Sequence, residues 1–477
     1  METSHALARH FAPPPAPLWR GLALAALLAA GCLASAAVRA QEDPPGRAGR
    51  VADVSGNVRT LDAEGRWMDV VRNQVLSTGD RITTDQTGRA TLQVGSTVVR
   101  LGAGSDLVVT QMDDQHVRLR FDHGQLAVRV RSEDIPGELF IDTEEGAWVP
   151  HHAGQYRFDR VARQPLGAQA WSGDMLLEAP DSSLPVKAPQ RATVWRDGRN
   201  ATHYHLDPAV HDAFGDWVLA QDKQDDAHAA ANAAAQVSPE MTGEAELARF
   251  GTWSTGAGGM RLWTPAKLPA GWQPYQQGAW SWKRPWGWTW VDDQPWGFAP
   301  FHYGRWLQAR GRWAWTPGQW GAARPVFVPA LVGWIGGPLA VDGGPAIGWV
   351  PLAPDEPVFP GYAVSAKYWN AITEPAVAPA ARRPVAIGGR VRLVPVGAAT
   401  YANARLPGAV TVVAANSLGS WVPVSQMPGP RGAERRKPAF EKLLAAATPT
   451  APPGPPSGRS ALSASSPTLQ VPLVVTR

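Results

Sequence analysis

Residues 117–131 read VRLRFDHGQLAVRVR, and this stretch decides the fold class. Apolar residues occupy every second position on both sides of His123-Gly124, namely Val117, Leu119, Phe121, Leu126, Val128 and Val130. Side chains on a β-strand point alternately to opposite faces, so the pattern predicts one aliphatic face and one face rich in arginine. We expect an antiparallel hairpin that turns at His123-Gly124 and buries its aliphatic face.

Short strand patterns of the same kind extend over residues 49–200. Leu92 and Val94 alternate with Gln93 before a turn at Gly95-Ser96, and residues 62–65 and 102–104 supply further turns. Short, evenly spaced strands are typical of a sandwich or a solenoid. The sequence therefore predicts a mainly β protein whose first domain, residues 49–200, is an antiparallel β sandwich or solenoid.

Two stretches of this domain resemble the FecR domain. LSTGDRITT at 76–84, followed by GRATLQVGS at 88–96, is similar to that family's pattern of Gly-Asp, Thr and strands that end in a Gly-Ser turn. FIDT at 140–143 and GQYRF at 154–158 resemble its second half. The resemblance implies an exported β module. FecR proteins that signal iron relay to a sigma factor through a cytoplasmic N-terminal domain, and the segment before residue 22 is too short for one.

Residues 22–38, LALAALLAAGCLASAAV, form an apolar run that follows Arg20 and precedes a small-x-small site at 38–40. This is typical of a secretory signal peptide. We expect a signal peptide at 1–40, a linker at 41–48, and a periplasmic or secreted protein without a membrane span after cleavage. Cys32, the only cysteine, lies in the run, so the mature chain would lack thiol chemistry and disulfides. The alternative is a lipid anchor at Cys32.

The composition excludes several classes of protein. Of 477 residues, 48 are Gly and 45 are Pro, which argues against a helix bundle. The net charge of +4 arises without a basic stripe, so we expect no nucleic-acid partner. The sequence has no zinc-ligand spacing, phosphate-binding glycine loop or nucleophile elbow. No cofactor and no metal site are therefore expected.

Residues 204–250 are predicted to form a helical connector. Asp207-Pro208 fits an N-cap and first helical residue, and Phe214 and Val218 follow at helical spacing. In this interpretation Asp212, Asp216 and Asp222 lie on the opposite, polar face. Ser238-Pro239 is predicted to begin a second short helix.

Residues 251–375 hold an internal repeat. Fifteen of the 23 tryptophans lie between Trp253 and Trp349, and GWQPYQQGAW at 271–280 aligns with GFAPFHYGRW at 297–306, an offset of 26. Residues 315–318 open a degenerate third copy. We expect units of two or three short strands, with Pro285 dividing one strand from the next. The stretch 285–306 resembles a Trp-rich module of unknown function that follows FecR-like domains in exported proteins.

The tryptophans allow two interpretations. They form a core, or they form an exposed platform that stacks on sugar rings or Pro-rich peptides. The platform interpretation names these ligand-binding candidates: Trp280, Trp282, Trp286, Trp288, Trp290, Trp306, Trp313, Trp315 and Arg305. Asp292-Asp293 is the best acidic pair of the region, but adjacent strand residues face opposite sides and a turn role is favoured. Asp80 likewise fits a turn acceptor beside Gly79.

The function expected from these features is a non-catalytic, exported cell-envelope protein that binds or scaffolds. Its partner would be an envelope glycan or another envelope protein. One alternative is a FecR-like regulator of envelope or metal signalling, and another is a cell-wall polysaccharide hydrolase that uses Asp293 or another acid. Residues 376–477 are predicted to be a largely disordered Pro/Ala-rich tail, with a short strand at 408–413 and a brief helix at 439–446.

Overall fold

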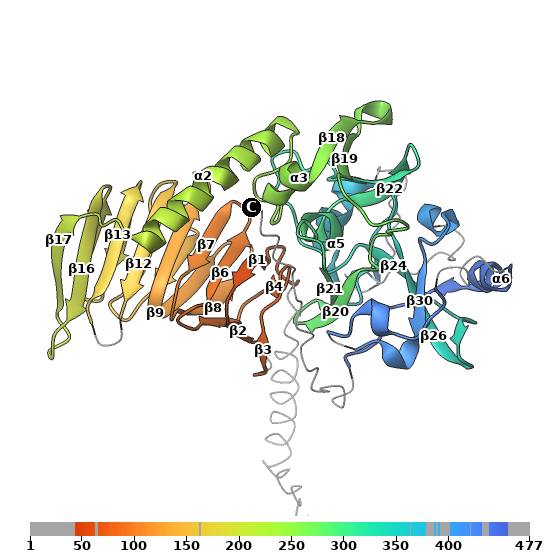
Figure 1. The fold of residues 1–477 in the computed structure, drawn as a ribbon, viewed down its shortest axis with the longest axis horizontal. Helices are drawn as coiled ribbons and strands as arrows, with labels where there is room; N and C mark the ends of the chain where they lie inside the picture. The colour runs from red at the N-terminus through yellow and green to blue at the C-terminus, as the bar shows by residue number, and fades with distance from the viewer. Residues whose placement is uncertain are drawn as a thin grey trace, which may run out of the picture. The chain divides into compact units, whose positions relative to one another are not determined.

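The computed structural model describes residues 43–62, 65–161, 164–362, 364–377, 386–387, 390–391, 401–419, 421–431 and 438–456. The expected signal peptide and Cys32 lie outside these ranges. The described residues from Pro44 onward belong to one compact unit. The described chain is mainly β, as predicted, with few helices (Figure 1). No helix in these ranges is both long and apolar enough to cross a membrane.

The first seventeen strands form one sheet that folds into two facing layers. The first layer has the order β4 (Val75–Leu76), β1 (Gly49–Ser55), β6 (Arg89–Val94), β7 (Thr97–Leu101), β9 (Val117–Val130), β12 (Gly154–Arg160), β13 (Leu166–Ser172), β16 (Gln190–Arg196) and β17 (Thr202–Pro208). The second has the order β3 (Trp67–Asp69), β2 (Val58–Leu61), β5 (Arg81–Thr84), β8 (Asp106–Met112), β9, β10 (Leu139–Asp142), β11 (Ala147–Pro150), β14 (Asp174–Glu178) and β15 (Ser183–Lys187).

Strand β9 belongs to both layers, and this corrects the hairpin predicted at His123-Gly124. Its first half pairs with β8 and β10 in the second layer, and its second half pairs with β7 and β12 in the first. Gly124 has a φ of 100°, and a Cβ there would lie 2.3 Å from Cα of Ser105. The glycine therefore bends the strand from one layer into the other without reversing it.

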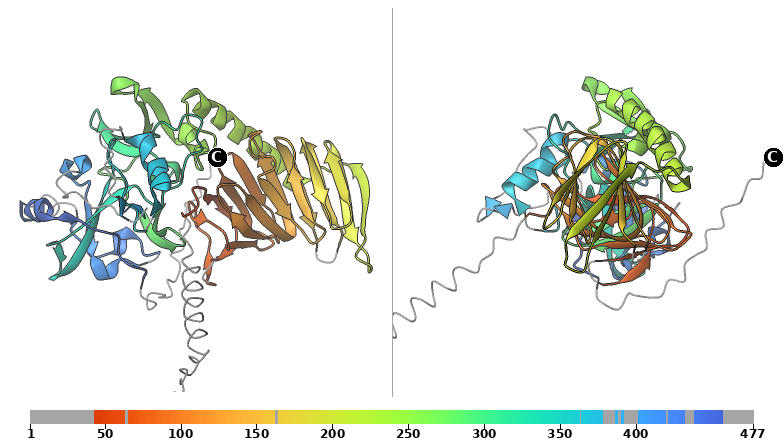
Figure 2. Two further views of the ribbon diagram at one scale, coloured as in Figure 1. Left: turned by 180° about the vertical axis from the view of Figure 1, so that it is seen from behind. Right: turned by 90° about the vertical axis from the view of Figure 1, so that its left-hand side faces the viewer.

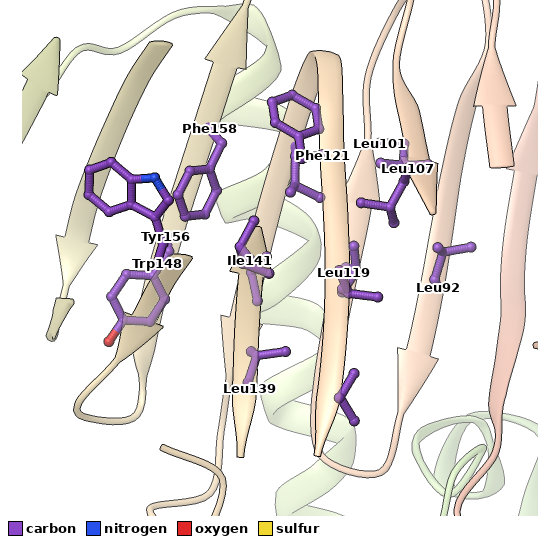
Figure 3. Close-up of a cluster of buried hydrophobic side chains, with 14 of the residues drawn as sticks. Leu92, Leu101, Leu107, Leu119, Phe121, Leu139, Ile141, Trp148, Tyr156 and Phe158 are labelled. Atoms are coloured by element: carbon purple, nitrogen blue, oxygen red, sulfur yellow. The ribbon is translucent and has the colours of Figure 1, made fainter. Parts of the chain in front are cut away.

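The aliphatic faces of the two layers enclose the core of this domain. Figure 3 shows Leu92, Leu101, Tyr156 and Phe158 from the first layer facing side chains of the second, which are Leu107, Leu119, Phe121, Leu139, Ile141 and Trp148. The period-two pattern thus places apolar residues inside, as predicted.

Helix α2 (Ala213–Ala234) lies on the outer face of the first layer (Figure 2). Phe214 and Val218 pack there against Ala127. The predicted helix start at Asp207-Pro208 is wrong, because both residues pair with β16 as part of β17 and Asp212 caps the helix instead. The second helix, α3 (Ala245–Phe250), begins later than the predicted Ser238-Pro239. Strand pairing outweighs the local capping signal here.

The Trp-rich region contains four β-hairpins, each with at least one pair of tryptophans directly opposite one another. The hairpins are β18 (Gly251–Thr255) with β19 (Arg261–Pro265), β20 (Gly278–Lys283) with β21 (Gly287–Asp292), β22 (Arg305–Ala309) with β23 (Arg312–Thr316), and β24 (Val332–Gly336) with β26 (Gly344–Pro351). The opposed pairs are Trp253–Trp263, Trp280–Trp290, Trp282–Trp288, Trp306–Trp315 and Trp334–Trp349, two of them in the β20–β21 hairpin. Pro285 lies in the turn between β20 and β21, as predicted.

Shorter elements complete this region, and they include part of the predicted tail. They are η1 (Ala257–Gly259), α4 (Ala299–His302), β25 (Ala340–Val341), β27 (Val364–Ser365), α5 (Ala366–Thr373), η2 (Glu374–Ala376), β28 (Ala386–Ile387), β29 (Arg390–Val391), η5 (Ala402–Arg405), β30 (Thr411–Ala414), η6 (Ala415–Ser417), η7 (Val424–Gln426), α6 (Pro438–Ala446) and β31 (Thr448–Pro449). Strand β30 pairs with β26, and Val413 and Met427 join the Trp-rich core. Packing therefore extends beyond residue 375, where the sequence placed its end.

Candidate functional site

The outer face of the first layer carries arginines that pair with acids on and before helix α2. Arg157 of β12 donates to Asp212 at 2.7 Å, and Arg129 of β9 lies 3.0 Å from Asp226. Both arginines alternate along their strands with core residues, so they point away from the core. The acidic residues of the helix therefore complement the arginine face of the sheet.

The centre of this network is buried. Arg100 of β7 pairs with Asp222 and also with Asp225, at 2.6 Å. The side chains of Arg100 and Asp222 are each 2% exposed. Moving α2 away from the sheet would leave the buried charges of this ion pair uncompensated, which is costly. The network therefore holds α2 against the sheet. The expectation that Asp222 lies on the solvent face is wrong, because the arginines of the sheet draw it inward.

The network has one further acid in an unusual state. Glu244, which precedes α3, accepts a hydrogen bond from Asn232 of α2 at 2.7 Å. Asn232 in turn accepts from the indole of Trp253 at 3.3 Å. Burial raises the pKa of Glu244 to about 7. This carboxyl group therefore changes charge near neutral pH at the junction of α2, α3 and β18.

A cleft of about 490 Å³ opens beside this network, and we call it the arginine cleft. Its walls come from β1, β6 and β7 on one side and from α2 and α3 on the other. Five arginines line it, namely Arg72, Arg89, Arg100, Arg131 and Arg249. Three carboxylates also line it, namely Asp53, Asp225 and Glu246. Positive charge thus exceeds negative charge in the cleft.

Two of these arginines pair with no carboxylate among the described residues. The guanidinium of Arg89 lies 5.0 Å from the ring centre of Trp217, and that of Arg249 lies 5.0 Å from that of Phe250. In addition, Nε of Arg100 is buried and has no hydrogen-bond partner in the described part of the chain. A guanidinium above an aromatic ring keeps its N–H edge available for a carboxylate or a phosphate. The cleft is therefore suited to an anionic ligand.

No motif of the amino-acid sequence marks this cleft. Its residues come from positions 52 to 295, and neither Arg89 nor Arg249 stands in a recognisable motif. The arginine face of the strands predicts that an acidic element packs on it. It does not predict which part of the sheet that element leaves exposed.

The tryptophans proposed as a ligand platform lie elsewhere, inside the Trp-rich region. Trp282 is half-buried, and the others of that set are buried, namely Trp280, Trp286, Trp288, Trp290, Trp306, Trp313 and Trp315. Their rings meet edge to face or tilted, as in the Trp280–Trp290 pair at 5.3 Å. Arg305 is also buried and donates to the carbonyl oxygens of Gly304 and Glu356. The geometry favours packing over a stacking surface for this set.

The acidic candidates lie at turns, as predicted, with Asp292 as the last residue of β21 and Asp293 directly after it. Asp292 is buried and accepts from N–H of Gln294 at 2.9 Å and from the indole of Trp290 at 3.0 Å, whereas Asp293 is exposed. Burial raises the pKa of Asp292 well above its ordinary value. The two carboxyl groups therefore do not face a common space. Asp80 accepts from N–H of Ser77 at 2.7 Å.

Comparison with solved structures gives weak similarities. Two crystal structures of a candidate anti-sigma factor from Parabacteroides distasonis, at 2.50 and 1.65 Å resolution, share 15% and 13% sequence identity with this chain. The TM-scores are 0.24 and 0.25, over 27% and 29% of this chain. The chain spans 60% and 64% of those two proteins. Similarity this low does not indicate a shared fold.

Comparison with sequences gives one result for the Trp-rich region. No curated protein matches this chain. Residues 244–356 match the model of DUF6600, a family of unknown function. The match covers α3 and the four tryptophan hairpins, and it agrees with the expectation of a Trp-rich module without a known activity.

Proposed function

We propose that this protein is a non-catalytic binding protein of the cell envelope, and that the arginine cleft holds an anionic glycan. The observation that carries the proposal is the pair Arg89 and Arg249, which line one cleft, stack on aromatic rings and pair with no carboxylate among the described residues. Carboxylate or phosphate groups on sugars are planar or tetrahedral anions that guanidinium groups bind through two N–H bonds.

The aromatic residues beside these arginines support a glycan as the ligand. Trp217 of α2 lines the cleft and is partly exposed, as is Phe250 at the end of α3. Apolar C–H faces of sugar rings pack on aromatic rings, while the acidic substituents reach the guanidinium groups. The buried network of Arg100, Asp222 and Asp225 behind the cleft would keep α2 and its side chains in place.

The cellular location belongs to the same proposal and rests on the sequence. We infer export from the apolar run at 22–38 and from the FecR-like motifs of residues 76–96. Their turn residues have the expected roles, because the Gly95-Ser96 turn joins β6 to β7 and Asp80 closes a turn onto Ser77. Fractionation of cells tests this: the chain belongs in the envelope fraction, and a cytosolic chain of full length contradicts it. Unchanged processing of Cys32→Ser excludes the lipid anchor.

Calorimetric titration tests the binding function with two defined probes. Oligogalacturonate carries carboxylates and a glycerol-phosphate oligomer carries phosphates, and neutral maltohexaose is the control ligand. We expect one anionic probe to bind and Arg89→Gln/Arg249→Gln to weaken it about 100-fold, since each charged hydrogen bond contributes about 1.5 kcal/mol or more. Arg59→Gln is the matched control, because Arg59 also stacks on an indole, that of Trp67, outside the cleft.

Three results would contradict the proposal. Neither anionic probe binds, maltohexaose binds as well as the acidic oligomers, or the double variant binds as tightly as the wild type. Comparison of the two anionic probes shows whether the cleft prefers carboxylate or phosphate.

A further inference from the structure

The first layer of the sandwich ends in an uncovered strand. β17 pairs only with β16 among the described residues, and it forms one end of the sheet in Figure 1. Tyr204 and Leu206 lie opposite Val194 and Ala192 of β16, which are core residues, and so they share the core side of the layer. Tyr204 is nevertheless 51% exposed and Leu206 is 38% exposed. The core is therefore open at this end.

The free edge of β17 presents the backbone groups of these same two residues. N–H of Ala209 donates to a carbonyl oxygen beside β16 at 3.0 Å, whereas N–H of Thr202 donates to the Asp181 carboxylate at 2.8 Å. Backbone groups alternate between the two edges of a strand. Odd-numbered residues therefore bond to β16, and the N–H and C=O groups of Tyr204 and Leu206 point to the free edge.

We propose that a second copy of this chain pairs with β17, antiparallel and about a two-fold axis at His205. In this register Tyr204 lies opposite Leu206 of the second copy, and the two exchange backbone hydrogen bonds on both sides of the axis. His203 lies opposite Asp207 of the second copy. The register is thus self-complementary, because Tyr204 meets Leu206 and the His203 imidazole meets the Asp207 carboxylate, while the two His205 side chains lie beside each other on the axis.

Self-complementarity favours a second copy over an unrelated extended peptide. A two-fold contact uses the same surface on both subunits, so every favourable pair occurs twice. The imidazole of His203 is already held in place, since it stacks on Trp195 at 5.7 Å and contacts Asp197 at 3.0 Å. The second copy also covers the apolar faces of Tyr204 and Leu206, which continue the core of each sandwich.

The interface between the two β17 strands is small, so we expect the dimer to be weak. β17 has seven residues, and a single pair of such strands buries less than the ~1,600 Å² of a standard interface. We therefore expect a dimer that dissociates in the micromolar range. The dimer would be populated at about 100 µM chain and largely absent at nanomolar concentrations.

Cysteine cross-linking tests the register in the full chain carrying Cys32→Ser. His205→Cys places two thiols opposite each other at a pair without backbone hydrogen bonds, where Cα atoms are ~4.5 Å apart and a disulfide fits. His203→Cys is the matched control, because its own copy lies four residues away along the strand, ~13 Å. We expect oxidised dimer from His205→Cys, none from His203→Cys, and a mixed dimer when His203→Cys and Asp207→Cys chains are combined.

Sedimentation equilibrium gives a second test that needs no cross-link. Tyr204→Lys/Leu206→Lys places lysines opposite each other on both sides of the axis, and we expect it to weaken dimerisation at least 100-fold. Val71→Lys, at another exposed apolar residue, is the control and should leave it unchanged. A monomer at all concentrations overturns the proposal. A dimer that resists the double lysine variant or lacks the His205→Cys cross-link overturns it too.

Discussion

Nζ of Lys283 lies 2.6 Å from Oδ1 of Asp80, and both side chains are buried. Asp80 precedes β5 of the sandwich and Lys283 ends β20 of the Trp-rich region, so the pair joins residues 203 positions apart. A second connection lies nearby, where the amide of Asn73 donates to the carbonyl oxygen of Asp292 at 2.9 Å. Asp80, which closes a turn onto Ser77, therefore also anchors the β20–β21 hairpin of the Trp-rich region.

Loss of Asp80 should be costly for this reason. Asp80→Ala leaves Lys283 buried without its carboxylate, and we expect it to lower the free energy of unfolding by about 3–5 kcal/mol. Urea denaturation measures the change. Asp69→Ala is the control, because the Asp69–Arg59 pair is exposed and 3.9 Å apart, and it should cost less than about 1 kcal/mol. If the two substitutions lower the free energy of unfolding equally, the buried Asp80–Lys283 pair stabilises the fold no more than the exposed pair does.

Glu244 should make stability depend on pH near neutrality. Its folded pKa of about 7 lies above the ordinary value of 4.5, so the folded state retains the proton longer than the unfolded chain. The stability that the protonated Glu244 contributes is therefore present in full below pH 4.5, and it is lost as the pH rises from 4.5 through 7. Glu244→Gln cannot lose a proton, so it should exceed the wild type in stability at pH 8 by on the order of 2 kcal/mol.

Urea denaturation from pH 5 to pH 8 measures the difference between Glu244→Gln and the wild type. That difference should grow with pH. Glu144→Gln, at an acid with a 79% exposed side chain, is the control for replacing a surface carboxylate by an amide. A flat difference for Glu244→Gln would mean that this carboxyl titrates normally in the folded protein.

The tryptophan hairpins should respond to substitution as a core. Trp290 is fully buried against Trp280, Tyr275 and Phe301, so Trp290→Ala should cost about 3–5 kcal/mol. Trp282 is only half-buried, and Trp282→Ala should cost clearly less. Thermal unfolding measures both. A stable Trp290→Ala that loses binding of the anionic probe would instead support the platform interpretation.

Helix α2 should loosen when its buried pair is broken. Asp222→Asn removes the more deeply buried of the two carboxylates that compensate Arg100, and we expect amide hydrogen exchange within Ala213–Ala234 to rise at least tenfold. Asp216→Asn, at an exposed acid on the same helix, should leave exchange unchanged. Unaltered exchange in Asp222→Asn would mean that the apolar contacts of Phe214 and Val218 alone hold the helix.

The sequence alone determined the features that depend on neighbouring residues. Alternation in residues 117–131 fixed which side chains face the core, and Pro285 fixed where one tryptophan strand ends, because a proline cannot complete the ladder of hydrogen bonds. The repeat with an offset of 26 correctly indicated small strand units, and the opposed pairs Trp280–Trp290 and Trp306–Trp315 lie in two of them.

Tertiary structure decided everything that depends on a distant partner. Gly124 could have reversed the chain, but strands β7, β8, β10 and β12 offer both halves of β9 a neighbour, so the strand continues through the bend. Asp222 could have faced water, but it lies inside because the buried guanidinium of Arg100 requires a carboxylate beside it. The arginine cleft exists only because α2 and α3 lie over β1, β6 and β7, and the edge at β17 is open because β17 pairs only with β16 among the described residues. No local pattern encodes either arrangement.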